Sequence, residues 1–149
     1  MVAAIVVLVG ALVAWGQLRD AGSSHAVAWR DITAELGPIR YPHSTIRHFS
    51  VKVNIRKYLR QAMPGGAPAA PPIPPGDEVI LVGAGPRSSS GYGVKIVSVV
   101  DHPRRVVVTA REITPTLGQH VVPGLTFPYR LILIHRIKKS VSLVWLGRS

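Results

Sequence analysis

The stretch VILVGAGPRSSSGYG, residues 79–93, decides how this chain is read. It begins as an apolar run typical of a buried strand and continues into Gly83 and Gly85, as many dinucleotide-binding loops do. Such a loop also needs a third glycine and a following helix. Ser88 occupies the third place, and the next segment, YGVKIVSVV, alternates as a strand does. We therefore interpret the stretch as a glycine turn between two strands.

The segments around this turn predict more strands and one helix. Upstream, IRHFSVKVN alternates with Phe49, Val51 and Val53 on one face, and NIRKYLRQAM has helical spacing with Asn54 as its N-cap. Downstream, turn residues separate the apolar runs EVILVGA, YGVKIVSVV, RVVVTAREI, YRLILIHRI and SVSLVWL. The sequence predicts a mostly β fold, a small antiparallel β-barrel or sandwich with one short α-helix.

An apolar segment and a Pro-rich stretch divide the chain. The uncharged run Val2–Gly16 is shorter than the ~20 residues of a spanning helix, and it suits a secretory signal or a hydrophobic anchor helix. We predict a signal peptide or membrane anchor over residues 1–18 and a tether over 19–44, with two helical turns in AVAWRDITAEL. A β-domain follows over 45–149, with a Pro-rich loop at 64–76. The domain would be extracytoplasmic and membrane-anchored, or secreted after cleavage near Gly16.

Charge and cysteine content limit the classes of partner. The chain has 18 Lys and Arg against 7 Asp and Glu, a net charge of +11, and no cysteine. Disulfides, thiolate zinc sites and a cysteine nucleophile are therefore excluded. A basic surface attracts polyanions, so anionic lipid is one available partner. The aromatic residues do not interleave with Lys and Arg as a base-stacking surface requires, which disfavours nucleic acid.

Catalytic and metal-binding patterns are weak in this sequence. The histidines have no spacing typical of a metal site, and the adjacent Asp77 and Glu78 would point to opposite faces of a strand. Ser90, His120 and Asp101 include the residue types of a catalytic Ser-His-Asp triad, but the sequence around the serine does not resemble a nucleophile elbow. We predict a protein that is not an enzyme and has no catalytic residues, metal or cofactor.

Two loops and one acidic residue are the predicted partner-binding site. Glu112 would share an inner strand face with valines, and there it would need a partner such as Arg130 or backbone amides. Phe127 and Tyr129 would lie near the glycine turn, where rigid aromatic rings either anchor an interface or plug the end of the domain. The predicted site consists of Ser89, Ser90, Gly91, Tyr92, Glu112, Thr126, Phe127, Pro128, Tyr129 and Arg130.

Three motifs in order resemble the PrcB C-terminal family over about residues 46–147. Its Thr-Gly-Gly-Tyr turn corresponds to Ser90-Gly91-Tyr92, and its V-x-V-x-x-x-E-x-x-P segment to Val108 through Glu112 and Pro115. Its Thr-x-Pro-Tyr segment corresponds to residues 126–129. The chain departs from the family where Ser89-Ser90 replaces Thr-Gly, and where Gln119-His120 stands in place of a frequent cysteine.

The resemblance implies an exported, often membrane-anchored, non-catalytic domain, similar to an assembly or stability factor of a secreted subtilisin-like protease. The predicted function is therefore that of an accessory subunit of an envelope protein complex, which binds another protein such as a protease. Two alternatives stay open. One is a structural subunit of a larger membrane assembly held by its basic surface, and the other is a loop-based protease inhibitor.

Overall fold

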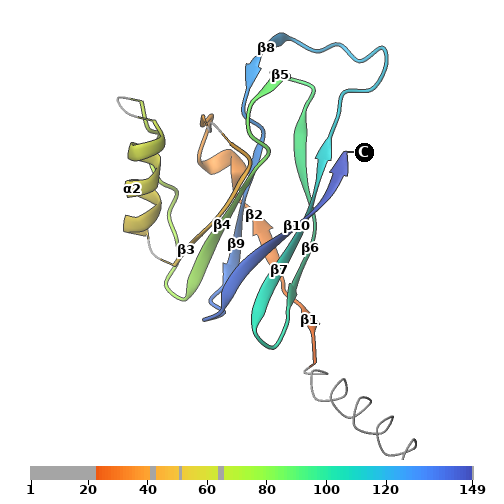
Figure 1. Cartoon of the computed structure of the whole chain (residues 1–149). Coiled ribbons are helices and arrows are strands. Elements are labelled where there is room, and N and C mark those ends of the chain that lie inside the picture. Colours follow the sequence, from red (N-terminus) through yellow and green to blue (C-terminus); the bar gives the residue numbers. More distant parts are fainter. Residues whose placement is uncertain (1–22, 41–42, 51, 64–65, 149) are drawn as a thin grey trace, which may run out of the picture.

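The computed structural model describes residues 23–40, 43–50, 52–63 and 66–148, which form ten strands, one α-helix and one 3-10 helix (Figure 1). The predicted signal or anchor over 1–18 lies outside the described residues. Among those described, no helix combines the length and apolarity needed to span a bilayer. The elements are β1 (His25–Ala26), β2 (Trp29–Asp31), η1 (Thr33–Glu35), β3 (Thr45–Phe49), α2 (Lys52–Ala62), β4 (Asp77–Gly83), β5 (Arg87–Ser89), β6 (Gly93–Asp101), β7 (Arg105–Ile113), β8 (Pro123–Thr126), β9 (Tyr129–His135) and β10 (Ser140–Arg148).

The strands form two four-stranded sheets and one two-stranded sheet. Sheet A has the order β1-β6-β7-β10, sheet B the order β2-β9-β4-β3, and sheet C pairs β5 with β8. The mostly β fold with one short helix is confirmed. The barrel alternative is wrong, because no described strand joins the outer edges of β3 and β10. The antiparallel prediction fails at one pair, since the chain crosses from β9 in sheet B to β10 in sheet A, where β10 runs parallel to β7.

Sheet B is apolar on both faces, which explains its continuous apolar runs. On one face, Ile80 and Val82 pack against the inner face of sheet A. On the other face, Val79 and Leu81 pack against Ile55 of α2. The domain therefore has three layers, with sheet B between sheet A and the helix (Figure 1).

Residues 23–40, which the sequence analysis assigned to a tether, instead contribute to these sheets and to the core. β1 pairs with β6 and β2 with β9, and Ile32, Leu36 and Ile39 are buried in the cluster beneath α2. The stretch AVAWRDITAEL, expected to form two helical turns, forms β2 and a single 3-10 turn. Pairing with β9 decides this local structure, and the short segment alone carries no signal of that pairing.

The boundary between β3 and α2 also differs from the prediction. β3 ends at Phe49 and α2 begins at Lys52, so Asn54 lies within the helix and is not its N-cap. Residue 51 lies outside the described part of the chain, while Val53, expected to extend the strand, belongs to α2. The valines continue the alternation of the strand and so hide the helix start. The helical spacing of Ile55 and Leu59 is confirmed, because both side chains are buried.

The Pro-rich loop has no strand over residues 66–76, as predicted. Ala67, Ala70 and Ile73 are partly buried against the cluster that α2 covers. The loop therefore lies on the domain as a covering segment and is not a free linker.

Candidate functional site

The glycine stretch forms a strand, a bend, a short strand and a turn. β4 ends at Gly83, β5 follows from Arg87, and a turn at Ser90 and Gly91 leads into β6. Gly85 has a φ of +81°, and a Cβ there would lie 2.9 Å from the backbone nitrogen of Ser44. Both its backbone conformation and its close contact therefore require glycine. A strand and not a helix follows the glycines, so the rejection of a dinucleotide loop is confirmed.

β5 and β8 lie at one end of the sandwich, at the top of Figure 1. The Thr126 hydroxyl donates a hydrogen bond to the carbonyl of Ser89 at 2.7 Å. The Val122 N–H donates to the Ser90 hydroxyl at 2.9 Å, and the Ser90 N–H donates to the carbonyl of Val122 at 3.0 Å. The structure thus joins the serine turn to the segment that ends in Thr126.

The loop of residues 114–122 packs over Gly91. A Cβ at this glycine would lie 2.7 Å from the Pro115 ring, and it would also overlap the side chain of Val121. A proline ring cannot rotate away as a long side chain can, so any larger residue at Gly91 would displace the loop. Tyr92, the next residue, is half-buried between this turn and β6.

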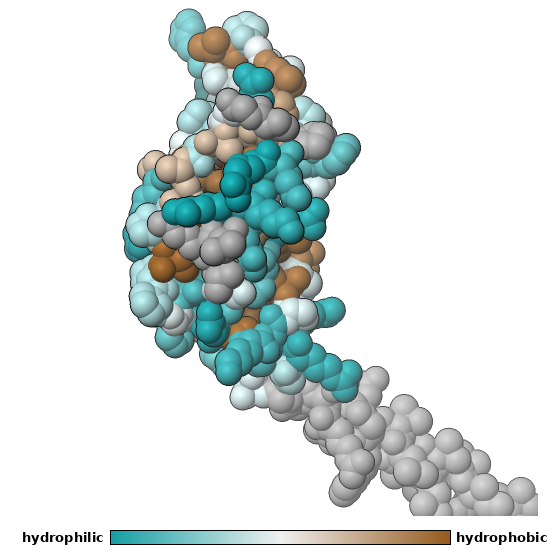
Figure 2. Space-filling model, turned by 90° about the vertical axis from the view of Figure 1, so that its left-hand side faces the viewer, coloured by the Kyte–Doolittle hydropathy of each residue, from teal (hydrophilic) through white to brown (hydrophobic). Residues whose placement is uncertain are grey.

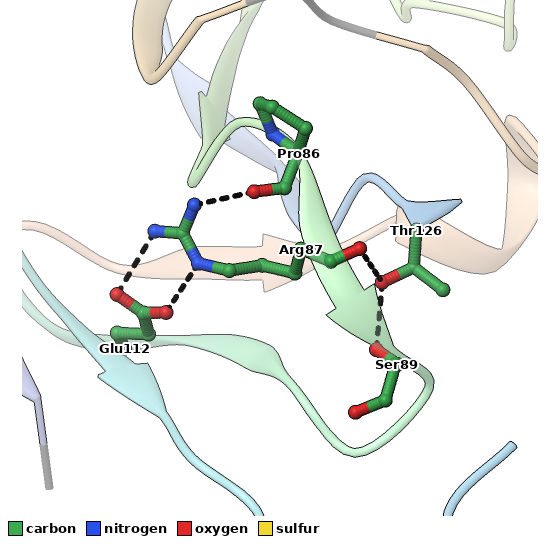
Figure 3. Close-up of polar contacts among 5 residues, drawn as sticks. All are labelled: Pro86, Arg87, Ser89, Glu112 and Thr126. Atoms are coloured by element: carbon green, nitrogen blue, oxygen red, sulfur yellow. Dashed lines mark hydrogen bonds and ion pairs between the residues drawn. The ribbon is translucent and has the colours of Figure 1, made fainter. Parts of the chain in front are cut away.

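A buried ion pair joins β5 to β7 below the turn. The Nε and Nη2 of Arg87 donate to the two carboxylate oxygens of Glu112 at 2.5 and 3.0 Å (Figure 3). Only 2% of Glu112 is exposed, and the Nη1 of Arg87 donates to the carbonyl of Pro86 at 2.8 Å. The hydrogen bonds that Arg87 donates to Glu112 raise the pKa of its guanidinium. The paired hydrogen bonds offset part of the cost of burying the two charges.

The inward position of Glu112 is confirmed, but its expected partner Arg130 is wrong. Arg130 instead donates from Nε to the carbonyl of Val94 at 2.7 Å, and its Nη1 lies 3.7 Å from Asp31. Arg87 was not predicted from the sequence as the partner of Glu112. The separation between Arg87 and Glu112 along the chain is bridged only because β5 folds over the end of β7.

The aromatic loop turns away from the glycine turn. Phe127 and Tyr129 pack against the cluster shared by α2 and sheet B, and the carbonyl of Pro128 accepts from the Ala84 N–H at 2.9 Å. The Tyr129 hydroxyl donates to the carbonyl of Thr33 at 3.2 Å and contacts the carbonyl of Gly37. The two rings therefore plug the domain, which was one of the two interpretations of this loop.

Burial raises the pKa of Tyr129 to about 12 from 10.0, and the nearby Asp31 charge adds to the increase. The folded state thus retains this proton more tightly than the unfolded state, so its stability contribution is complete below pH 10 and is lost between pH 10 and about 12. Allowing for solvent screening of a half-buried ring, we expect a loss of about 1 kcal/mol. Urea unfolding of the native chain and of Tyr129→Phe across this range measures it. An equal pH slope in both proteins would contradict the assignment to Tyr129.

Three large apolar side chains are exposed at the same end of the molecule. Leu117 is fully exposed, and Val122 and Leu125 are 70% and 71% exposed. Figure 2 shows hydrophobic side chains at its upper end, where β5, β8 and their connecting loops lie. These side chains could not be predicted as exposed, because this turn-rich segment has no periodicity that separates inner from outer positions. Clustered exposed apolar side chains of this size mark interaction sites.

The central part of the chain matches a known family. Residues 79–135 match the family described as PrcB C-terminal. The resemblance noted in the sequence is thereby confirmed over this segment. No curated protein and no solved structure shows a significant match to the chain.

The PrcB-like segment extends from β4 to β9 and contains the glycine turn, the Arg87–Glu112 pair and the exposed loop. It is an accessory type of domain and is not one with a known catalytic activity. Within the ranges that the structure describes, no group of three His, Asp or Glu side chains could hold a metal ion. Ser90 precedes β6 and Asp101 ends it, so the length of β6, roughly 27 Å, separates the two residues of the triad considered above.

Proposed function

We propose that this chain is a non-catalytic accessory subunit that binds another protein through its β5–β8 end. We define this end as β5, β8 and the loop of residues 114–122. The observation that carries the proposal is the exposure of Leu117, Val122 and Leu125 on a backbone that hydrogen bonds hold in place. Their combined apolar surface is available to a partner without rearrangement of the domain.

The turn that presents Leu117 is closed at both ends. The Gln119 N–H donates to the carbonyl of Thr116 at 3.0 Å, and the Thr116 N–H donates to the side-chain oxygen of Gln119, also at 3.0 Å. Ser90 ties the end of this loop, at Val122, to the turn after β5, and the buried Arg87–Glu112 pair ties β5 to sheet A. A loop held in this way loses little conformational entropy on binding, which favours affinity.

The match to the PrcB C-terminal family supports a protease complex as the setting of this interaction. We further propose that the domain is exported and held at the membrane by residues 1–18. The uncharged apolar run Val2–Gly16 supports this proposal. In this arrangement the domain would act as an assembly or stability factor, with the β5–β8 end directed at its partner.

Site-specific photocrosslinking in intact cells tests the proposed surface. A photoreactive phenylalanine derivative at position 117 should form a discrete crosslinked product with one partner protein, because this side chain is fully exposed. The matched control carries the same group at Lys57, an exposed position on α2. Crosslinking of the same protein from both positions, or from position 57 alone, would show that the partner docks elsewhere.

A further inference from the structure

Every carboxylate side chain that the structure describes lies within ion-pair distance of a basic side chain of the same domain. Asp20 lies outside the described residues, and each of the other acidic residues has a basic partner within ion-pair distance. Lys95, Arg111, Arg56 and Arg60 are not among these partners, so no described carboxylate neutralises them. The pairs are Asp31–Arg130, Glu35–Arg30, Asp77–His135, Glu78–His48, Glu78–Arg136, Asp101–Lys139, Asp101–His25 and Glu112–Arg87.

Two of these cations face each other on sheet A. Lys95 of β6 lies directly opposite Arg111 of β7 in the antiparallel register, and both side chains are exposed. Their neighbours along each strand point into the core, so the two cations share the outer face of the sheet. Like charges directly opposite destabilise a strand pair. Among the described residues, neither cation has an acidic partner that would relieve the repulsion.

Exposed apolar side chains surround this pair. Val97 of β6 is 47% exposed, Ile113 of β7 is 38% exposed, and Val144 and Leu146 of β10 are each 46% exposed. Trp145 packs inward, so its neighbours in β10 lie on the same outer face as the cations. We define the outer face of sheet A as Lys95, Val97, Arg111, Ile113, Val144 and Leu146.

We propose that the outer face of sheet A is a second docking surface, which binds a partner-protein segment with carboxylates between apolar side chains. Charge complementarity requires a negatively charged partner segment, because no described carboxylate pairs with Lys95 or Arg111. The apolar side chains favour protein over lipid, because half-exposed residues on a sheet face can be covered by the apolar side chains of a partner segment. This surface is distinct from the β5–β8 end and does not depend on it.

α2 provides a matched control surface. Arg56 and Arg60 are exposed there and have no ion-pair partner among the described residues, as is also true of the sheet A pair. The side of the domain that carries α2 faces the viewer in Figure 2, and much of it is hydrophilic. No large apolar side chain of the described part of α2 is exposed. The variants K95E/R111E and R56E/R60E change the net charge equally, on two different surfaces.

The test uses the ¹⁵N-labelled full chain in a neutral detergent and a capped Glu-Leu-Glu-Leu-Glu peptide as the probe. We expect saturable amide shifts in β6, β7 and β10, and none with the Gln-Leu-Gln-Leu-Gln peptide. K95E/R111E should weaken peptide binding at least about tenfold, whereas R56E/R60E should change it less than about twofold. Equal losses in both variants would show attraction to net charge alone and would overturn the proposal.

Two further measurements separate this role from a structural one and from lipid binding. K95E alone places a carboxylate opposite Arg111, so it should raise the melting temperature while it weakens peptide binding. A lower melting temperature would indicate that Lys95 serves the fold. Vesicles containing phosphatidylglycerol provide the last comparison. If they, and not the peptide, bind in a manner sensitive to K95E/R111E, the partner is a membrane and the proposal fails.

Discussion

Replacing Arg87 by methionine should lower the free energy of unfolding by about 3–5 kcal/mol, the largest effect on stability that we expect from a single change. The substitution leaves the carboxylate of Glu112, which is only 2% exposed, without the guanidinium that donates two hydrogen bonds to it. It should also loosen β5, because the ion pair joins β5 to β7 of sheet A. Urea denaturation followed by circular dichroism measures the loss.

The double variant Arg87→Met/Glu112→Leu is the control for this prediction. With both charges replaced by apolar groups of similar volume, most of the stability should return, because no uncompensated charge stays buried. A single Arg87→Met variant that loses less than about 1 kcal/mol would contradict the account. That result would mean that solvent screens the pair and that the pair does not fix the β5–β8 end.

Strands β6 and β7, which follow the glycine turn, were predictable because one face of each is solvated. In β6 and β7, Val94, Ile96, Val106 and Val108 alternate with outward residues, and the alternation appears directly in the sequence. Sheet B was harder to interpret because both of its faces are buried, so β4 and β9 are continuous apolar runs. These runs predict strands, but they do not show that one face meets a second sheet and the other a helix.

The topology was predictable only in part, because it depends on contacts between distant segments. The short strands β1 and β2 have little pattern of their own and form by pairing with β6 and β9. The parallel position of β10 depends on a crossing between sheets, and the apolar run of β10 is compatible with several arrangements. The sequence therefore predicted the class of the fold, while the packing of distant strands determined a sandwich and not a barrel.

The candidate site, like the topology, was predictable only in part. The alternation of β7 correctly predicted that Glu112 points inward. Its partner depends on the path of β5, which the sequence does not show. Arg130 was therefore predicted as the partner, whereas Arg87 forms the ion pair. Tyr129, expected in the aromatic loop, is the first residue of β9, and its ring packs into the core. The exposed Leu117 could be recognised only once the loop was in place over Gly91.

Serine substitutions at Leu117, Val122 and Leu125 should abolish partner capture while the domain stays folded. The three side chains are mostly solvent-exposed, so their truncation removes little core packing and the thermal unfolding curve should stay close to the native one. Burying one Leu or Val side chain contributes about 1.5–3 kcal/mol, so losing three of them should reduce capture by at least about tenfold. Trp29→Ser is the control, because Trp29 is an exposed apolar residue outside this end, on β2.

The most direct measurement of the central claim is therefore affinity capture with the tagged full chain from detergent-solubilised native membranes at low and high salt. The native chain and the Trp29→Ser variant should retain a stoichiometric partner at high salt, where charge-driven association weakens, and the triple serine variant should lose it. If the folded triple serine variant retains the same partner at high salt in native yield, the β5–β8 end is not the binding surface.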